Sequence, residues 1–170
     1  DGLDTPRNTT KKDSWKTAEF RDRGLKPDRC LGEVKFENIH MFYPARPSRQ
    51  VLNDMSLKIP QGCVCALVGP SGGGKSSIIS LMQHLYEPSR GSLYIDGKNI
   101  HSFSPDWLSR HVSVVSQEPI LFARSIYRNI IYGLEGTPYE PSVDDVKEAA
   151  RLANASSFIE ALPSGYETDV

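Results

Sequence analysis

The feature that most constrains the fold is a glycine-rich segment near the middle of the chain, Gly69-Pro70-Ser71-Gly72-Gly73-Gly74-Lys75-Ser76-Ser77. It fits the pattern G-x-x-x-x-G-K-[ST] at Gly69, Gly74, Lys75 and Ser76. Glycine lets the backbone curl tightly and bring its N–H groups onto an oxyanion. In such a loop the lysine reaches the β- and γ-phosphates, the serine hydroxyl coordinates Mg²⁺, and the following helix adds its positive dipole end. The segment therefore predicts a phosphate-binding loop between a strand and a helix.

The residues on both sides of the loop favour this interpretation over a plain glycine-rich turn. The run Cys63–Val68 is apolar and bounded by glycines, which is typical of a buried strand in a parallel sheet. Cys63 and Cys65 would point to the same face and serve as small buried side chains. After the loop, apolar residues recur at helical spacing as far as Tyr86, and Pro88 ends the pattern.

Length and composition are those of one ordinary domain. The chain has 170 residues and a net charge of -1, so no basic field indicates a nucleic acid partner. No apolar run approaches the roughly 20 residues that span a bilayer, and the start of the chain does not read as a signal peptide.

The remaining elements follow from periodicity and from turn residues. Residues 1–30 are polar and charged, which predicts a linker or tail. In the strand expected at 33–41, Val34, Phe36 and Ile39 would point inward, and Asp96-Gly97 predicts a hairpin turn. We also expect strands at 51–59, 91–95 and 112–115, and helices at 106–110, 143–153 and 156–162.

Several segments together resemble one family, the nucleotide-binding domains of ABC transporters, in the exporter branch that includes multidrug and antigen-peptide transporters. The glycine-rich loop is similar to the family's Walker A segment, with Ser71 between the first glycines. The run Phe42-Tyr43-Pro44-Ala45-Arg46-Pro47, followed by Val51-Leu52, resembles the adenine-stacking loop, and Val114–Phe122 resembles the Q-loop. Residues 125–130 and 165–168 also follow the exporter pattern.

The resemblance implies a role for each matching residue. ATP and Mg²⁺ would be the cofactors, with Lys75 and Gln117 as the catalytic residues and Ser76 and Gln117 as the metal ligands. Tyr43 would stack on the adenine, which suits an aromatic face. Gln117 would hold Mg²⁺ or the attacking water, as an amide oxygen can. The nucleotide-binding set would be Tyr43, Val51, Gly69, Ser71, Gly72, Gly73, Gly74, Lys75, Ser76, Ser77 and Gln117.

The fold expected from the resemblance is α/β. It has a RecA-like P-loop NTPase core, an antiparallel β subdomain and the start of an α-helical subdomain. Residues 31–170 would be the N-terminal part of an ABC-type ATP-binding domain. The family's signature motif, Walker B, D-loop and switch histidine have no counterpart here, so we expect a truncated domain that does not hydrolyse ATP alone.

The intact protein would be a transport-coupled ATPase of an integral membrane exporter. The implied partners are a second nucleotide-binding domain, identical or not, and a transmembrane domain. The domain would lie on the cytosolic or matrix side of the membrane. The sequence does not identify the cargo, and peptides are one candidate. Two alternatives remain at this point: a soluble P-loop ATPase without a transporter, and a non-catalytic nucleotide-binding fragment.

Overall fold

The computed structural model describes residues 23–170 of the chain, which form two compact units. The first unit ends at Val114, and the second comprises Val115–Val170. Most of the predicted tail, residues 1–22, lies outside the described residues. The described part of the tail contacts the first unit, because Leu25 N–H donates to Ser102 O at 2.7 Å and Trp107 Nε1 donates to Pro27 O at 2.8 Å. The predicted domain boundary at residue 30 stays a prediction.

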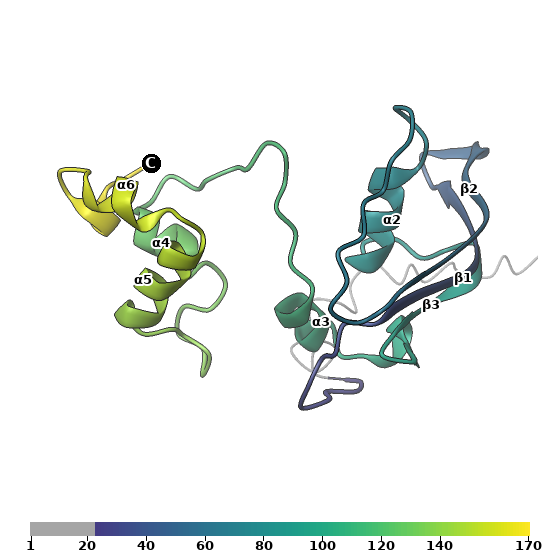
Figure 1. Ribbon diagram of the computed structural model, residues 1–170, viewed down its shortest axis with the longest axis horizontal. Helices are drawn as coiled ribbons and strands as arrows, with labels where there is room; N and C mark the ends of the chain where they lie inside the picture. Colours follow the sequence, from purple (N-terminus) through teal and green to yellow (C-terminus); the bar gives the residue numbers. More distant parts are fainter. Residues whose placement is uncertain (1–22) are drawn as a thin grey trace, which may run out of the picture. The chain divides into compact units, whose positions relative to one another are not determined.

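The first unit is built on a four-stranded antiparallel sheet with the strand order β2-β1-β3-β4 (Figure 1). Its strands are β1 (Val34–Tyr43), β2 (Arg46–Ile59), β3 (Arg90–Ile95) and β4 (Lys98–Asn99). The strands predicted at 33–41, 51–59 and 91–95 are confirmed. Strand β2 starts earlier than predicted and contains Pro47, which is tolerated because β2 is an edge strand with no sheet neighbour on one side.

The predicted hairpin turn at Asp96-Gly97 joins β3 to β4. Both residues have positive φ, 50° and 72°, and Ile95 pairs with Lys98, as a two-residue type I′ turn requires. The Asp96 carboxylate also accepts hydrogen bonds from the N–H groups of Leu31 at 2.7 Å and Glu33 at 2.9 Å. One turn residue therefore holds the segment that leads into β1.

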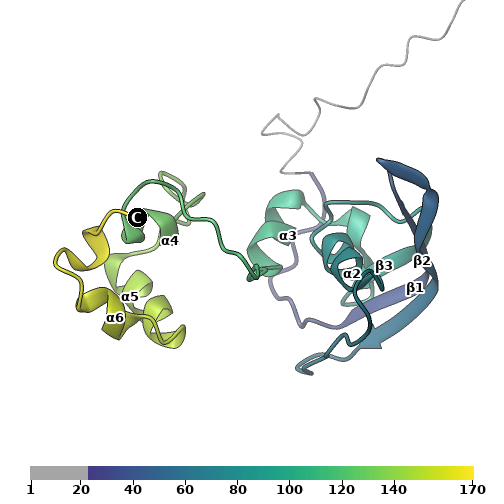
Figure 2. The ribbon, with the colours of Figure 1, turned by 90° about the horizontal axis from the view of Figure 1, so that it is seen from above.

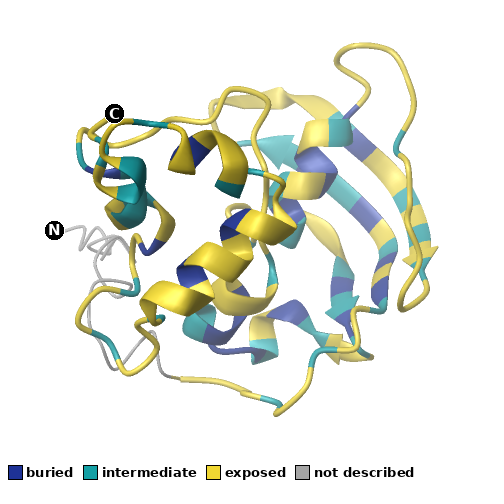
Figure 3. Cartoon of the chain, turned by 60° about the vertical axis from the view of Figure 1, so that its left-hand side comes forward, coloured by how far each residue is buried: buried dark blue, intermediate teal, exposed yellow. Residues whose placement is uncertain are grey.

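Two helices, α2 (Lys75–Met82) and α3 (Pro105–His111), cover one face of the curved sheet (Figure 2). Buried and exposed residues alternate along the strands (Figure 3), and Val34, Phe36 and Ile39 are buried as predicted. The core is formed by Val34, Phe36, Ile39, Met41, Leu52, Ile78, Leu81, Leu93, Ile95, Ile100, Phe103, Trp107 and Leu108.

The helix after the glycine-rich loop is shorter than its apolar pattern predicted. It ends at Met82, so Leu85 and Tyr86 lie beyond it. His84 has a φ of 54°, a left-handed conformation that ends the helical path.

Two predicted strands are wrong. Cys63–Val68 and Val112–Val115 form no strand and pair with none in the described part of the chain. Cys63 and Cys65 are exposed rather than buried, and Val68 is 91% exposed. A buried parallel strand needs hydrogen-bonding neighbours and covered faces, and the described sheet consists only of β1 to β4. An apolar run was therefore not enough to predict a strand, because a strand also needs partners from other segments.

The second unit is helical, with α4 (Ile126–Ile130), α5 (Val143–Leu152), α6 (Ser156–Glu160) and the 3₁₀ helix η3 (Gly165–Glu167). The helices predicted at 143–153 and 156–162 are confirmed. A capping box begins α5: the Ser142 hydroxyl accepts from Asp145 N–H, and the Asp145 carboxylate accepts from Ser142 N–H. Among residues 23–170 no helix combines the length and the apolar character that crossing a membrane requires.

Candidate functional site

The glycine-rich loop and the tip of the β1–β2 hairpin line a common pocket in the first unit. Its volume is about 590 Å³, within the roughly 300–1,000 Å³ of small-molecule sites. The structure thus places most of the predicted nucleotide-binding residues around one cavity. The lining residues are Tyr43, Arg46, Arg49, Gln50, Val51, Ser71, Gly72, Gly73, Gly74, Lys75, Ser76 and Ser77.

Gly74 fits the loop against β2. Its φ is 85°, in the left-handed region, and it directly precedes α2. A Cβ at this position would lie 2.7 Å from Leu52 Cδ2 and 3.2 Å from Val51 O. Glycine is therefore required here both by the backbone conformation and by the close approach of β2.

Lys75 begins α2 and folds back over the loop. Its Nζ donates to the carbonyls of Gly69 and Pro70, each at 2.7 Å. Gly69 does not line the pocket, but its carbonyl accepts a hydrogen bond from Lys75, which does. The Lys75 ammonium has three N–H donors, and these two bonds use two of them. Lys75 also lies at the N-terminus of α2, the positive end of the helix dipole.

Tyr43 stands at the end of β1, where the hairpin meets the loop. Its hydroxyl and the Ser77 hydroxyl are 2.9 Å apart and hydrogen-bonded. The Tyr86 ring meets the Tyr43 ring edge to face, with centroids 5.0 Å apart. These two contacts fix an aromatic ring beside the loop, in the lining of the pocket.

Sequence reasoning missed three lining residues, Arg46, Arg49 and Gln50, as pocket residues. With Lys75, the arginines give the lining three cations and no carboxylate. Such a lining favours a ligand with several negative charges. The signal was in the sequence, since Arg46 and Arg49 come three and six residues after Tyr43. Only the hairpin register, which pairs Tyr43 with Arg46 and Phe42 with Gln50, brings this segment back beside Tyr43.

Gln117 belongs to the second unit, where it lies in an exposed loop. The loop's continuation is held by the Asn129 side chain, which accepts from Phe122 N–H at 2.9 Å and donates to the carbonyls of Phe122 and Arg124 at 3.0 and 3.1 Å. Gln117 and the pocket residues belong to different units, so the role of Gln117 stays a prediction.

Comparison with known proteins gives consistent matches. The family model described as ABC transporter matches residues 52–166. ABC multidrug transporter atrC of Emericella nidulans is 47% identical over 154 residues, which are 88% of this chain and 12% of that protein. ABC transporter B family member 3 of Dictyostelium discoideum is 45% identical over 153 residues, 90% of this chain and 10% of that protein. The chain thus spans only a small part of the length of these relatives.

A solved structure of a bacterial Atm1-family ABC exporter with ATP bound matches with a TM-score of 0.75 and 35% identity. The match covers 87% of this chain and 25% of that one. The likeness in fold and in sequence decides against a P-loop ATPase of an unrelated class. The chain belongs to the ABC transporter family, as part of an exporter-type nucleotide-binding domain.

Proposed function

We propose that the pocket binds ATP with Mg²⁺. The observation that carries this proposal is the shared cavity of the glycine-rich loop and Tyr43, lined by three cations and no carboxylate. A polyphosphate needs the cations and the loop, and a flat base needs the aromatic face. The matching solved exporter structure has ATP bound, which supports the same ligand here.

Each part of the nucleotide would meet a different set of residues. The loop from Gly69 to Ser77 would hold the phosphates, and their oxygens would replace the Gly69 and Pro70 carbonyls as acceptors for Lys75. Ser76 would supply a Mg²⁺ ligand, and Mg²⁺ usually takes only one or two protein groups beside phosphate and water. Tyr43 would stack on the base, with Val51 beside it.

Arg46 and Arg49 would add positive charge at the hairpin. By the family resemblance, Gln117 would bind Mg²⁺ or the attacking water. Lys75 and Gln117 are the residues we assign to catalysis, Lys75 by stabilising charge on the phosphates and Gln117 by positioning water or metal.

In the whole protein, the domain would couple ATP binding and hydrolysis to transport across a membrane. It would pair with a second nucleotide-binding domain and contact a transmembrane domain, placing it on the cytosolic or matrix side. The named multidrug relatives support transport of drug-like solutes, and peptides are a further candidate.

Binding of a fluorescent ATP analogue to the 170-residue chain tests the site. We expect Mg²⁺-dependent binding that Lys75→Ala removes and that Tyr43→Ala weakens, whereas Tyr43→Phe keeps the ring and most of the affinity. Loss with Lys75→Ala but none with Tyr43→Ala would contradict base stacking. Unchanged binding in Lys75→Ala would contradict the phosphate site itself.

We further propose that this chain alone binds ATP weakly and does not turn it over. This proposal follows from the sequence prediction that the family's Walker B and signature motifs have no counterpart among the 170 residues. Phosphate release measured with excess ATP should stay at the level of buffer. A turnover that Lys75→Ala abolishes would refute this proposal.

A further inference from the structure

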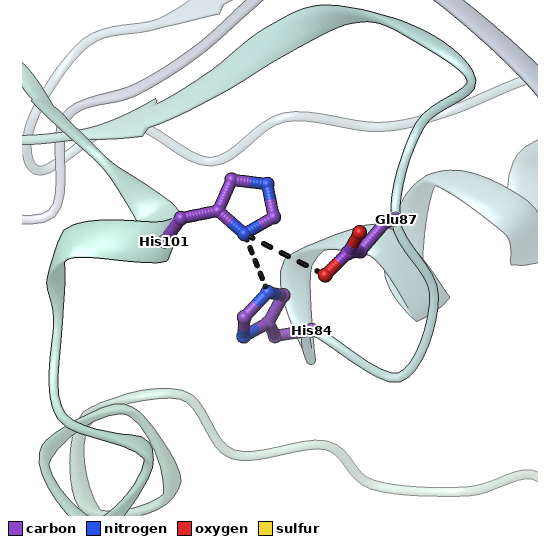
Figure 4. Close-up of side chains that lie close together, drawn as sticks. All are labelled: His84, Glu87 and His101. Carbon is purple, nitrogen blue, oxygen red and sulfur yellow. Dashed lines mark hydrogen bonds and ion pairs between the residues drawn. The ribbon is translucent and has the colours of Figure 1, made fainter. Parts of the chain in front are cut away.

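Three side chains with metal-ligating atoms converge at a place that the nucleotide pocket does not use (Figure 4). His84 Nε2 lies 3.1 Å from His101 Nδ1, and Glu87 Oε1 lies 3.9 Å from the same Nδ1. The ligating atoms all lie within 4.8 Å of one another. His84 and Glu87 belong to the turn after α2, and His101 belongs to the 3₁₀ helix η2 (Ile100–Ser102) that follows β4.

The distances suit a small cation. A tetrahedral zinc ion with Zn–N bonds of about 2.0–2.1 Å separates two nitrogen ligands by about 3.3 Å, close to the distance between the histidine nitrogens. The Glu87 carboxylate lies farther from the two histidine nitrogens than a carboxylate bound to the same ion would. Its side chain is 75% exposed and can rotate toward them. Loss of the hydrogen bond between the two imidazoles and rotation of the Glu87 carboxylate separate the observed arrangement from a three-ligand site.

The backbone holds both histidines in place. His84 has the left-handed φ of 54°, and its N–H donates to Leu81 O at 3.0 Å. His101 N–H donates to the Asn99 side chain at 3.0 Å, which fixes the start of η2. Ligands held in advance lower the ordering cost of binding.

The two imidazoles can also present their facing nitrogens to a metal. A neutral imidazole offers one lone pair, and each ring can carry its proton on the nitrogen that faces away from the metal.

We propose that His84, Glu87 and His101 bind a divalent transition-metal ion, and that zinc is its best occupant. Two imidazoles and one carboxylate are a donor set that zinc accepts, with a fourth position left for water. Mg²⁺ and Ca²⁺ prefer oxygen ligands, so the site is chemically distinct from the Mg²⁺ site of the nucleotide pocket.

The metal would join η2 to the turn after α2, at the end of α2 that lies away from the glycine-rich loop. The two ends of α2 lie about 12 Å apart, because the helix has eight residues. Tyr86 lies between His84 and Glu87, and its ring contacts Tyr43 in the pocket. The metal would thus hold the turn that carries the neighbour of Tyr43.

Equilibrium dialysis of the full 170-residue chain against zinc tests the proposal. Because the exposed Cys63 and Cys65 can also bind zinc, every protein in the test carries Cys63→Ser and Cys65→Ser. We expect one zinc per chain, retained in excess Mg²⁺. His84→Gln and His101→Gln should each weaken binding by about tenfold or more, and Glu87→Gln should have a smaller effect.

The two remaining histidines are matched controls, so His40→Gln and His111→Gln should leave zinc binding unchanged. Failure of the chain to retain zinc, unchanged binding in His84→Gln, or an equal loss in His40→Gln would each overturn the proposal.

A second measurement needs no histidine variant. Zinc should shift the ring ¹⁵N resonances of His84 and His101, and shifts confined to His40 and His111 would also overturn the proposal.

Discussion

Replacing Gly74 by alanine tests how the glycine-rich loop is packed against β2. The left-handed φ of 85° costs a residue with a Cβ about 1–2 kcal/mol. The new Cβ would also lie 2.7 Å from Leu52 Cδ2, and overpacking of this kind costs about 1–3 kcal/mol. We therefore expect Gly74→Ala to lower the free energy of unfolding of the first unit by roughly 2–5 kcal/mol.

Gly97 is the matched control, because its φ is 72° and a Cβ there would meet nothing within 4 Å. Gly97→Ala should show only the conformational cost of about 1–2 kcal/mol. Replacing Leu52 by valine in the Gly74→Ala background should relieve the clash, so the two substitutions should cost less together than the sum of their separate effects.

Urea denaturation followed by tryptophan fluorescence measures these differences. Trp107 is buried in the core of the first unit, so its fluorescence follows that unit, and the measurements use a Trp15→Phe background because Trp15 lies outside the described residues. Midpoints are compared at equal slope, because a changed slope would indicate a different unfolded state. If Gly74→Ala were no more destabilising than Gly97→Ala, the close approach of Leu52 would not limit the residue at position 74.

Tyr43→Phe should lower the stability of the first unit by about 1 kcal/mol, because it removes the hydrogen bond to Ser77, and urea denaturation against wild type checks this value. Ser142→Ala should destabilise the second unit by about 1 kcal/mol through loss of the N-cap, seen as reduced helical circular dichroism on heating. Hydrogen bonds from Ser142, the side-chain bond first, hold the pKa of Asp145 below its usual value. This contribution is present above pH about 4 and is lost as the pH falls through the lower folded pKa, so an acid titration of wild type should show a larger loss than one of Ser142→Ala, which keeps only the backbone hydrogen bond. Zinc at about 100 times its Kd should raise the free energy of unfolding of the first unit by about 2.7 kcal/mol, and a chelator should reverse the gain. Equal stability with and without zinc would contradict the last prediction.

Much of the local structure could be predicted because its causes are local. The Asp96-Gly97 turn needs two residues that accept positive φ, and both are present. The capping box of Ser142 and Asp145 depends only on residues within four consecutive positions. The Walker A pattern identified the loop that lines the pocket, because its glycines and lysine act through their own backbone and side chain.

Pairing between segments could not be predicted in the same way. Cys63–Val68 has the composition of a buried strand, yet it is exposed, because burial depends on strands and helices contributed by other segments. The helix after the loop ended early because His84 takes a left-handed conformation, which histidine adopts only where its surroundings favour it.

The sequence by itself determined the phosphate-binding loop, the tight turn, the helix starts and the resemblance to one family, since each depends on neighbouring residues. Only the tertiary structure placed Arg46 and Arg49 in the pocket, through the register of the hairpin. It alone brought His101 to His84 and Glu87, across β3 and β4. These contacts depend on how distant segments pack, and local sequence patterns carry little information about packing at such separations.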